Sequence, residues 1–321
     1  MEAARATPPP PPLPRGARDD AHAVAEQYGV AGSEVMPMPV QGQVNLTVLL
    51  GSELVLRLPR TSRAEDLLVK ESQVIPLVRD AGVPTPELIS YDATRQHASV
   101  PYMVLRRARG ETLAARPLGR SGRRRTLGAL GEILRALHEI RMHRVGRVDI
   151  LPEPYTFSLP ELLDRLVKAG EIGGAQHVWL REQFERLRPG GPSLTDPVLL
   201  HRDVIPSNVM VDDAGEITGL LDWGCAEWGS PARDLVGLPL EDLTDLLWGY
   251  RADDGSELEL ERDALWYHLY LALARLLKEP STSEDRNWAA PRSATLLDLL
   301  ALTSGAGTQP WPDLLRTRST S

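Results

Sequence analysis

Three polar residues near the middle of the chain have the types and spacing needed to handle a phosphate group. They are Asp203, Asn208 and Asp222, within LLHRDVIPSNVMVDDAGEITGLLDWG at residues 199–224. Mg²⁺ prefers hard oxygen ligands, which the Asp222 carboxylate and the Asn208 amide oxygen supply. The Asp203 carboxylate can orient a hydroxyl and accept its proton. Together these residue types favour phosphoryl transfer from a nucleotide to an alcohol.

The elements around these residues predict that they converge. Short apolar runs at 209–211 and 217–221 flank the turn sequence DDAG at 212–215, which is typical of a β-hairpin. The hairpin would bring the amide and the second carboxylate to the same end of two paired strands, with the first carboxylate on the loop before them. The alternative is that each side chain only ends a strand or forms a turn. The complete spacing favours the functional interpretation.

The pattern H-x-D-x-x-x-x-N, followed by an apolar strand and D-W, resembles the antibiotic phosphotransferase family, which includes aminoglycoside and macrolide kinases and shares the protein-kinase-like fold. The resemblance implies that Asp203 is the catalytic base and that Asn208 and Asp222 are ligands of Mg²⁺, with ATP or GTP as co-substrate. It also implies that His201 and Asp234 support the catalytic loop. A helix cap explains Asp234 equally well.

The first third of the chain predicts a nucleotide-binding lobe. Residues 40–59 indicate a β-hairpin preceded by Gln41-Gly42-Gln43. In the resembling family this loop covers the nucleotide phosphates, and Gly42 lets the backbone approach them. The resemblance further implies that Leu105 lines the adenine pocket and that the backbone of Arg106 and Ala108 bonds the base edge.

Arg57 departs from the family pattern, which has a lysine at this point in the second strand. Glu71, on the following helix, matches the acidic partner of that lysine. An arginine keeps the charge and adds a bidentate fork, but it is longer and planar. Arg57 therefore either holds phosphates or forms a structural ion pair with Glu71; the third possibility is that both are surface charges on an edge strand and a helix.

We predict an α/β (α+β) fold of two lobes. The expected domains are a disordered Pro-rich tail at 1–18, a first lobe at 19–107 built from a five-stranded antiparallel sheet and a helix, and a mostly helical lobe at 108–321. The periodicity of apolar residues predicts helices over 19–29, 64–79, 119–140, 159–169, 175–187, 234–249, 259–278 and 291–303.

Composition limits where the protein works and what it binds. The single cysteine, Cys225, excludes an intrachain disulfide and fits a reducing, cytoplasmic setting; we expect it to be a small buried residue. No apolar run reaches the roughly 18 residues of a membrane span, so no membrane association is expected. The arginine run at 123–125 lacks an aromatic platform, which argues against nucleic acid. Nucleic-acid binding by the basic first half is kept as an alternative.

The charge of the second half predicts the acceptor. Residues 1–150 carry 21 basic and 16 acidic side chains, a net +5, whereas residues 151–321 carry 15 and 28, a net −13. A negative surface attracts a cation, so we expect a hydroxyl-bearing cationic acceptor, with an aminoglycoside-like antibiotic first. A macrolide, a basic peptide antibiotic and a choline- or homoserine-type metabolite are alternatives, as is a module that binds nucleotide without chemistry.

The acceptor site itself has no residue-level signature. We expect its wall in 158–187 and in the acidic stretch 253–263. No long activation segment follows Asp222, which argues against a protein substrate. Three aromatic residues are expected to pack in the core, namely Trp248, Trp266 and Tyr270. Arg202 is expected either to pair with a local carboxylate or to hold a phosphate.

Overall fold

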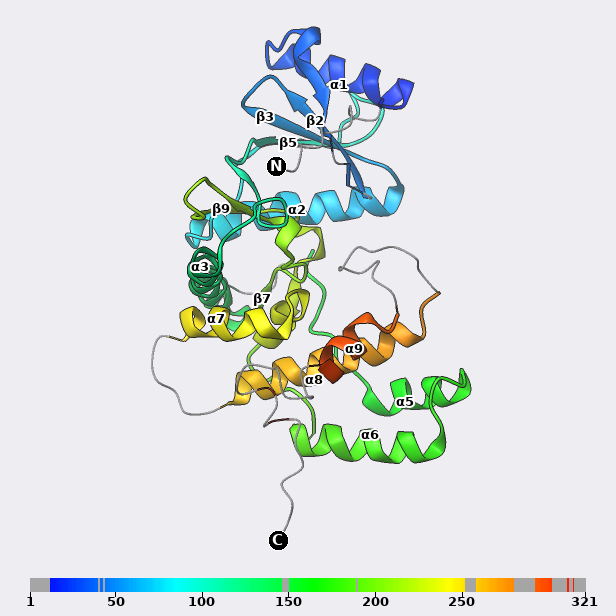
Figure 1. Ribbon diagram of the computed structural model, residues 1–321. Helices are drawn as coiled ribbons and strands as arrows, with labels where there is room; N and C mark the ends of the chain where they lie inside the picture. Colours follow the sequence, from blue (N-terminus) through cyan, green and yellow to red (C-terminus); the bar gives the residue numbers. More distant parts are fainter. Residues whose placement is uncertain are drawn as a thin grey trace, which may run out of the picture.

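The computed structural model describes residues 12–39, 41–42, 44–145, 150–188, 190–251, 258–279 and 292–301, with Trp311 and Leu314. The chain folds into a first lobe of sheet and helices and a second lobe that is mostly helical, one above the other in Figure 1. The predicted two-lobed α+β architecture is confirmed. In the described part of the chain, no helix combines the length and the apolar character needed to span a membrane.

The first lobe is built on a five-stranded antiparallel sheet in the order β1-β2-β3-β5-β4. Its strands are β1 (Val35–Pro37), β2 (Asn45–Leu50), β3 (Leu54–Pro59), β4 (Leu88–Asp92) and β5 (Tyr102–Arg106). Gly51, at φ +63°, turns the chain between β2 and β3, so the predicted hairpin is confirmed. The three-residue β1 is too short to show a periodic pattern in the sequence.

Two helices cover opposite faces of this sheet. Neighbouring residues of β5 point to opposite faces and so contact different helices. Val104 packs in the apolar cluster that contains α1 (Arg15–Gln27), whereas Met103 packs in the cluster that contains α2 (Ser62–Asp80). Figure 1 shows α1 above the sheet and α2 below it. The prediction of a disordered tail over residues 1–18 is wrong from residue 12 onward, because α1 begins at Arg15 and Leu13 is buried against the sheet. Residues 1–11 lie outside the described part.

The chain enters the second lobe through a close backbone contact. Gly110 has φ +87°, and a Cβ there would lie 2.0 Å from the Val211 carbonyl oxygen, so only glycine fits. The next strand, β6 (Glu111–Thr112), pairs with β8 (Val209–Val211), which pairs with β9 (Ile217–Leu220). The predicted 209–221 hairpin is thus present at the junction of the lobes.

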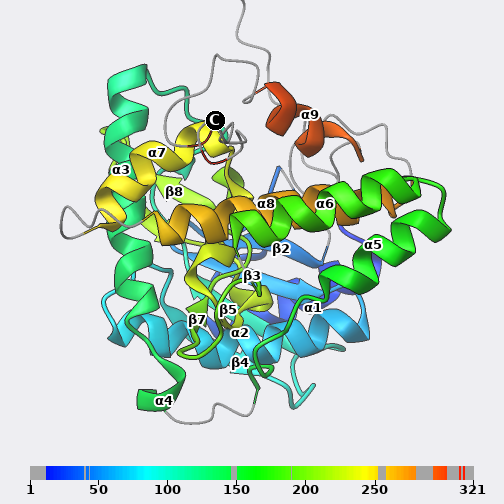
Figure 2. The same cartoon turned by 90° about the horizontal axis from the view of Figure 1, so that it is seen from below.

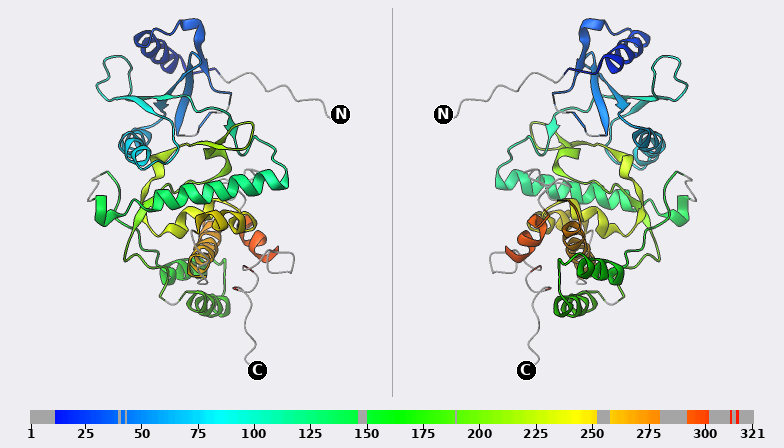
Figure 3. Two further views of the ribbon diagram at one scale, coloured as in Figure 1. Left: turned by 90° about the vertical axis from the view of Figure 1, so that its left-hand side faces the viewer. Right: turned by 90° about the vertical axis from the view of Figure 1, so that its right-hand side faces the viewer.

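Helices make up the rest of the second lobe. They are α3 (Arg120–His138), α4 (Met142–Val145), α5 (Leu159–Lys168), α6 (Gly174–Leu187), α7 (Leu240–Tyr250), α8 (Glu259–Leu276) and α9 (Ala294–Ala301). α3 lies just below the first lobe, while α5 and α6 lie at the far end (Figures 1 and 3). The predicted helix over 234–249 is wrong in its first turns, because Pro231–Gly237 is a 3₁₀ helix and Pro239 directly precedes α7. Proline is tolerated at the start of an α-helix but not in its interior, so a continuous helix through residue 239 cannot form.

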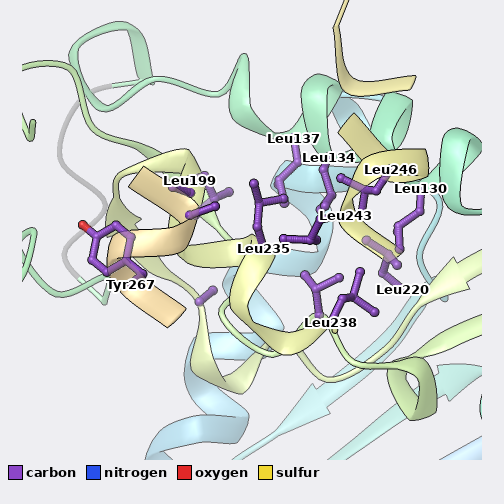
Figure 4. Close-up of a cluster of buried hydrophobic side chains, with 14 of the residues drawn as sticks. Leu130, Leu134, Leu137, Leu199, Leu220, Leu235, Leu238, Leu243, Leu246 and Tyr267 are labelled. Carbon is purple, nitrogen blue, oxygen red and sulfur yellow. The ribbon is translucent and has the colours of Figure 1, made fainter. Parts of the chain in front are cut away.

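The main core lies where α3 meets α7. Figure 4 shows Leu130, Leu134 and Leu137 of α3 facing Leu243 and Leu246 of α7, and all five are completely buried. A two-stranded sheet of β7 (Val198–Leu200) and β10 (Glu227–Gly229) borders this core. Burial of this many leucine side chains fixes the platform from which the loop after β7 emerges.

Glycines allow α3 and α7 to approach closely. A Cβ on Gly131 would lie 2.0 Å from the Leu246 carbonyl oxygen and 2.7 Å from the Tyr250 nitrogen, and one on Gly249 would lie 1.9 Å from the Gly128 carbonyl oxygen. These are backbone atoms, so no side chain can move aside. The helices can only pack at this separation without side chains at these two positions.

Gly131→Ala should therefore lower the free energy of unfolding by about 1–3 kcal/mol, despite the higher helix propensity of alanine. Chemical denaturation followed by circular dichroism measures it. Gly122→Ala is the matched control in the same helix, because its Cβ would meet only the Leu118 side chain at 3.7 Å. Equal stabilities of the two variants would contradict the packing described.

Candidate active site

The loop after β7 holds Asp203 and Asn208 together. The 201–208 loop runs from the end of β7 to a 3₁₀ turn at Pro206–Asn208 that leads into β8. The Asn208 Nδ2 donates to the Asp203 backbone carbonyl (2.9 Å) and to its carboxylate Oδ2 (2.8 Å). Burial raises the pKa of the half-buried Asp203 above its ordinary value. The amide oxygen of Asn208 is not used in these contacts.

The hairpin brings Asp222 to the same place. The Leu221 N–H donates to the Asn208 carbonyl oxygen (2.8 Å), which ties the end of β9 to the start of β8. Asp222 follows at φ +68°, in the left-handed region, before a 3₁₀ turn at Trp223–Cys225. Its side chain is 43% exposed. The predicted convergence of two carboxylates and one amide is therefore present.

Arg57 links the sheet of the first lobe to this group. The Arg57 Nη1 lies 2.5 Å from the Glu71 Oε1, and its Nη2 lies 3.3 Å from the Asp222 Oδ1. The Trp223 N–H also donates to Glu71, at 3.2 Å. Burial raises the pKa of the Glu71 carboxyl, while the Arg57 guanidinium favours its charged form. Of the three alternatives, the surface-charge reading is wrong, because Arg57 lies on the interior strand β3 and is largely buried.

Asp234 fixes the backbone of the 201–208 loop. Its carboxylate accepts from the His201 N–H (2.9 Å), the Arg202 N–H (2.7 Å) and the His138 Nε2 (3.1 Å). Burial alone would raise the pKa of Asp234, but the hydrogen bonds from His138 and the His201 N–H lower it below its ordinary value. The helix-cap alternative is wrong: Asp234 lies inside the 3₁₀ helix and bonds a different segment.

His201 is held in one tautomer by its two ring contacts. The Asp203 N–H donates to the His201 Nδ1 (3.2 Å), so the proton resides on Nε2, which donates to the Leu221 carbonyl oxygen (2.9 Å). Burial lowers its pKa, and the ring packs 4.4 Å from that of Trp223. A neutral, buried His201 therefore links the loop to the end of β9.

Arg202 turns away toward a local carboxylate. It has φ +72°, and its Nε lies 3.0 Å from the Glu227 Oε1. Arg233, which is buried, contacts the same carboxylate. Of the two predicted roles, pairing with a carboxylate is the one the structure shows. The sequence analysis missed Glu227 and Arg233. The carboxylate of Glu227 lies within a short apolar run before Pro231, and such a position could have indicated a buried ion pair.

The remaining predicted nucleotide residues lie on the first lobe and on the connection that follows it. The Gly42 carbonyl accepts from the Arg60 Nε (3.1 Å), which holds the loop after β1. Leu105 is buried on β5. The Arg106 N–H donates to the Glu87 carbonyl (2.9 Å), so this N–H is already used within the first lobe. Ala108 follows on the connection between lobes.

Two expectations for single residues are wrong. Cys225 is exposed rather than buried, because it lies at the outer end of the turn after Asp222. Trp248 is 71% exposed, whereas Trp266 and Tyr270 are buried as expected; the Trp248 ring lies over the edge of α3, where a Cβ on Gly128 would meet it at 3.5 Å. Part of the predicted acidic wall, residues 253–257, lies outside the described residues.

The donor set fits a magnesium ion carried by a nucleotide. Asn208 and Asp222 present hard oxygen atoms at one end of paired strands. Among the described residues, no group of three or more His, Cys, Asp or Glu side chains could hold a metal alone. Two protein oxygens leave coordination positions for phosphate oxygens and water, as Mg²⁺ sites on nucleotides commonly have.

Comparison with known proteins decides the family. A family model described as the phosphotransferase enzyme family matches residues 39–276. The chain belongs to this family. The resemblance drawn from the H-x-D-x-x-x-x-N pattern is thereby confirmed, and the chain is a phosphotransferase. A curated relative, the uncharacterized protein YcbJ of Bacillus subtilis (strain 168), is 32% identical over 115 residues, which span 33% of this chain and only about a third (35%) of that relative.

Solved phosphotransferases share the fold at low identity. The GDP complex of aminoglycoside 2'-phosphotransferase-IIIa has a TM-score of 0.60 at 19% identity, covering 88% of this chain and 96% of that one. Macrolide 2'-phosphotransferase MphH from Brachybacterium faecium has a TM-score of 0.58 at 20% identity, covering 80% and 91%. The predicted kinase-like fold of this phosphotransferase is confirmed.

Asp234→Asn should destabilise the protein by about 2–4 kcal/mol, because the amide would turn an NH₂ group toward N–H donors or leave them unpaired in the core. Urea unfolding measures the loss. Asp213→Asn is the control, since that side chain is 97% exposed, and it should change stability by less than about 1 kcal/mol. A similar small effect at Asp234 would contradict its role as the support of the 201–208 loop.

Proposed function

We propose that this phosphotransferase moves the γ-phosphoryl group of ATP or GTP to a hydroxyl of a small-molecule antibiotic. The observation that carries the proposal is the convergence of Asp203, Asn208 and Asp222 at the junction of the lobes, with Arg57 beside them. Carboxylate, amide and guanidinium are the groups needed to hold a metal–nucleotide and to activate an alcohol.

Asp203 is the proposed catalytic base. Its carboxylate orients the acceptor hydroxyl and takes its proton as the new O–P bond forms. Asn208 holds one carboxylate oxygen in place (2.8 Å), which leaves the other for the hydroxyl. The raised pKa of Asp203 makes its ionised carboxylate a better proton acceptor than that of an exposed aspartate.

Asn208 and Asp222 are the proposed metal ligands. Mg²⁺ bound there would neutralise charge on the phosphates as the leaving group departs. Arg57 is the proposed phosphate-binding cation, with Glu71 orienting its guanidinium by the 2.5 Å contact. Gly42, Leu105, Arg106 and Ala108 are the proposed boundary of the nucleotide site, by their place on the first lobe.

The acceptor class is supported only at a coarse level. Solved structures of this fold include a streptomycin–ATP ternary complex of an aminoglycoside phosphotransferase, with a TM-score of 0.59 at 15% identity, covering 83% of this chain and 93% of that one. The macrolide enzyme fits nearly as well. The negative second half of the chain favoured an aminoglycoside-like polycation, but its carboxylates include many that are already paired with arginines.

Asp203→Asn should reduce acceptor-dependent ADP release by at least about a thousandfold, because the amide cannot accept the hydroxyl proton. A coupled ADP-release assay over antibiotic alcohols measures it, and calorimetry should show that Mg–nucleotide binding is retained. In the wild type, kcat/KM should fall with an apparent pKa above 3.8 as the pH is lowered. Nucleotide binding without turnover in the wild type would favour the non-catalytic module.

Arg57→Ala should lower kcat/KM for the nucleotide by about 100–1000-fold, because a phosphate-binding charge is removed. Arg57→Lys keeps the charge but loses the fork that reaches Glu71 and Asp222, and it should cost about tenfold or less. Steady-state kinetics with thermal unfolding as a folding control measure both. If both variants lose only stability and keep their kinetic constants, Arg57 is a structural ion pair alone.

A further inference from the structure

The charged groups around the turn after Asp222 come from three segments of the chain. Cys225 ends this turn, and its side chain is exposed. Desolvation raises the pKa of the Cys225 thiol, and the carboxylates of Asp203 and Asp222 raise it further. The ammonium of Lys70 and the guanidinium of Arg202 lower the same pKa. Because such effects fall off with distance, these two cations lie near the two carboxylates of the proposed site.

Lys70 belongs to α2, and the packing of this helix places it beside the turn. The Trp223 N–H donates to the Glu71 carboxylate (3.2 Å). A Cβ on Gly224 would lie only 3.2 Å from the Leu67 Cβ, so glycine lets the turn and the helix approach. Residues three positions apart are neighbours on a helix surface, which puts Lys70 next to Leu67. The lysine therefore lies at the edge of the helix face that packs on this turn.

The Lys70 ammonium has no carboxylate partner in the part of the chain that the structure describes, although its side chain is half-buried. The other two cations near the site are paired. Arg57 contacts Glu71, and Arg202 contacts Glu227. An ammonium group carries three hydrogen-bond donors. Those of Lys70 remain for a ligand rich in oxygen atoms.

The proposed reaction needs a positive charge at this point. The terminal phosphoryl group of a nucleotide is negative, and it must approach a hydroxyl that is held by the Asp203 carboxylate. Its oxygens and that carboxylate repel each other. A cation near both Asp203 and Asp222 offsets this repulsion where the group is transferred, and such a charge has most effect where water is excluded.

We propose that Lys70 is a second phosphate-binding cation, whose ammonium contacts the terminal phosphoryl group of the nucleotide during its transfer. The bond from the terminal phosphorus to the bridging oxygen of the nucleotide breaks, the bond to the acceptor oxygen forms, and the hydroxyl proton passes to Asp203. Lys70 stays protonated throughout and only offsets charge. The inference rests on the proposed function, because it adds a residue to that reaction.

Nucleotide binding by the full chain tests this without an acceptor. Isothermal titration calorimetry compares Mg–ADP with Mg–AMPPNP, a non-hydrolysable triphosphate, so the two ligands differ in the terminal phosphoryl group. GDP and GMPPNP replace them if the wild type binds guanine nucleotides. Lys70→Met removes the charge and keeps the apolar stem, whereas Lys70→Arg keeps the charge.

Lys168→Met is the matched control. It makes the same change at an exposed lysine at the end of α5, which lies beside α6 at the far end of the second lobe (Figures 1 and 2). Thermal unfolding of each variant shows that it is folded at the temperature of the titrations.

We expect Lys70→Met to weaken the binding of the triphosphate by about tenfold or more, since a charge-assisted hydrogen bond is lost, and to leave the diphosphate unchanged. Lys70→Arg should lose less, and Lys168→Met should lose nothing. A lysine that only supports α2 would affect both nucleotides alike. Equal losses for the two nucleotides, no loss for either, or the same loss in Lys168→Met would overturn the inference.

The same titrations separate this inference from the proposed function. If Lys70→Met selectively loses the triphosphate but no antibiotic alcohol stimulates ADP release by the wild type, the proposed function fails and the assignment of Lys70 stands. If the wild type phosphorylates an antibiotic while Lys70→Met binds both nucleotides normally, only the assignment of Lys70 fails. If the wild type binds no nucleotide, both fail.

Discussion

The buried carboxylate of Asp234 is the constraint on which the site depends. It accepts hydrogen bonds from two consecutive backbone N–H groups, those of His201 and Arg202, and so holds Arg202 at a positive φ. That conformation sends the Arg202 side chain toward Glu227 and places Asp203 next to Asn208. The positive φ of Arg202 and the buried charge of Asp234 are each unfavourable alone. The hydrogen bonds between them offset both costs, because the backbone conformation aims the N–H groups at the carboxylate and the carboxylate holds that conformation.

The two lobes meet at the same point through a second set of contacts. Arg57, on the sheet of the first lobe, contacts both Glu71 and Asp222. Thr85 donates to the Leu220 carbonyl and accepts from the Trp223 indole, each at 2.8 Å. The residue types that do the proposed chemistry are therefore placed by contacts between segments far apart in sequence, as expected for a site between two lobes.

The sequence predicted what depends on local pattern. The hairpin between Asn208 and Asp222 has a strong turn signal, and the apolar periodicity of α3 is regular. The sequence could not predict the exposure or the partners of residues whose surroundings come from distant segments of the chain. Trp248 lies with its ring beside Gly128 of α3 and is 71% exposed, a placement that depends on how α7 packs against α3. The net charge of −13 in the second half does not by itself identify the acceptor, because a formal charge does not reveal its partner, as the Arg188–Asp263 and Arg251–Glu261 pairs show.

The central claim is that Asn208 and Asp222 jointly hold a metal–nucleotide beside Asp203. Electron paramagnetic resonance titration of Mn²⁺ in the presence of ADP measures this directly, without an acceptor or turnover. We predict that Asn208→Ala and Asp222→Ala each weaken Mn²⁺ binding by about tenfold or more, and that Asp203→Asn leaves it nearly unchanged. Wild-type Mn²⁺ affinity in both ligand variants would contradict the account.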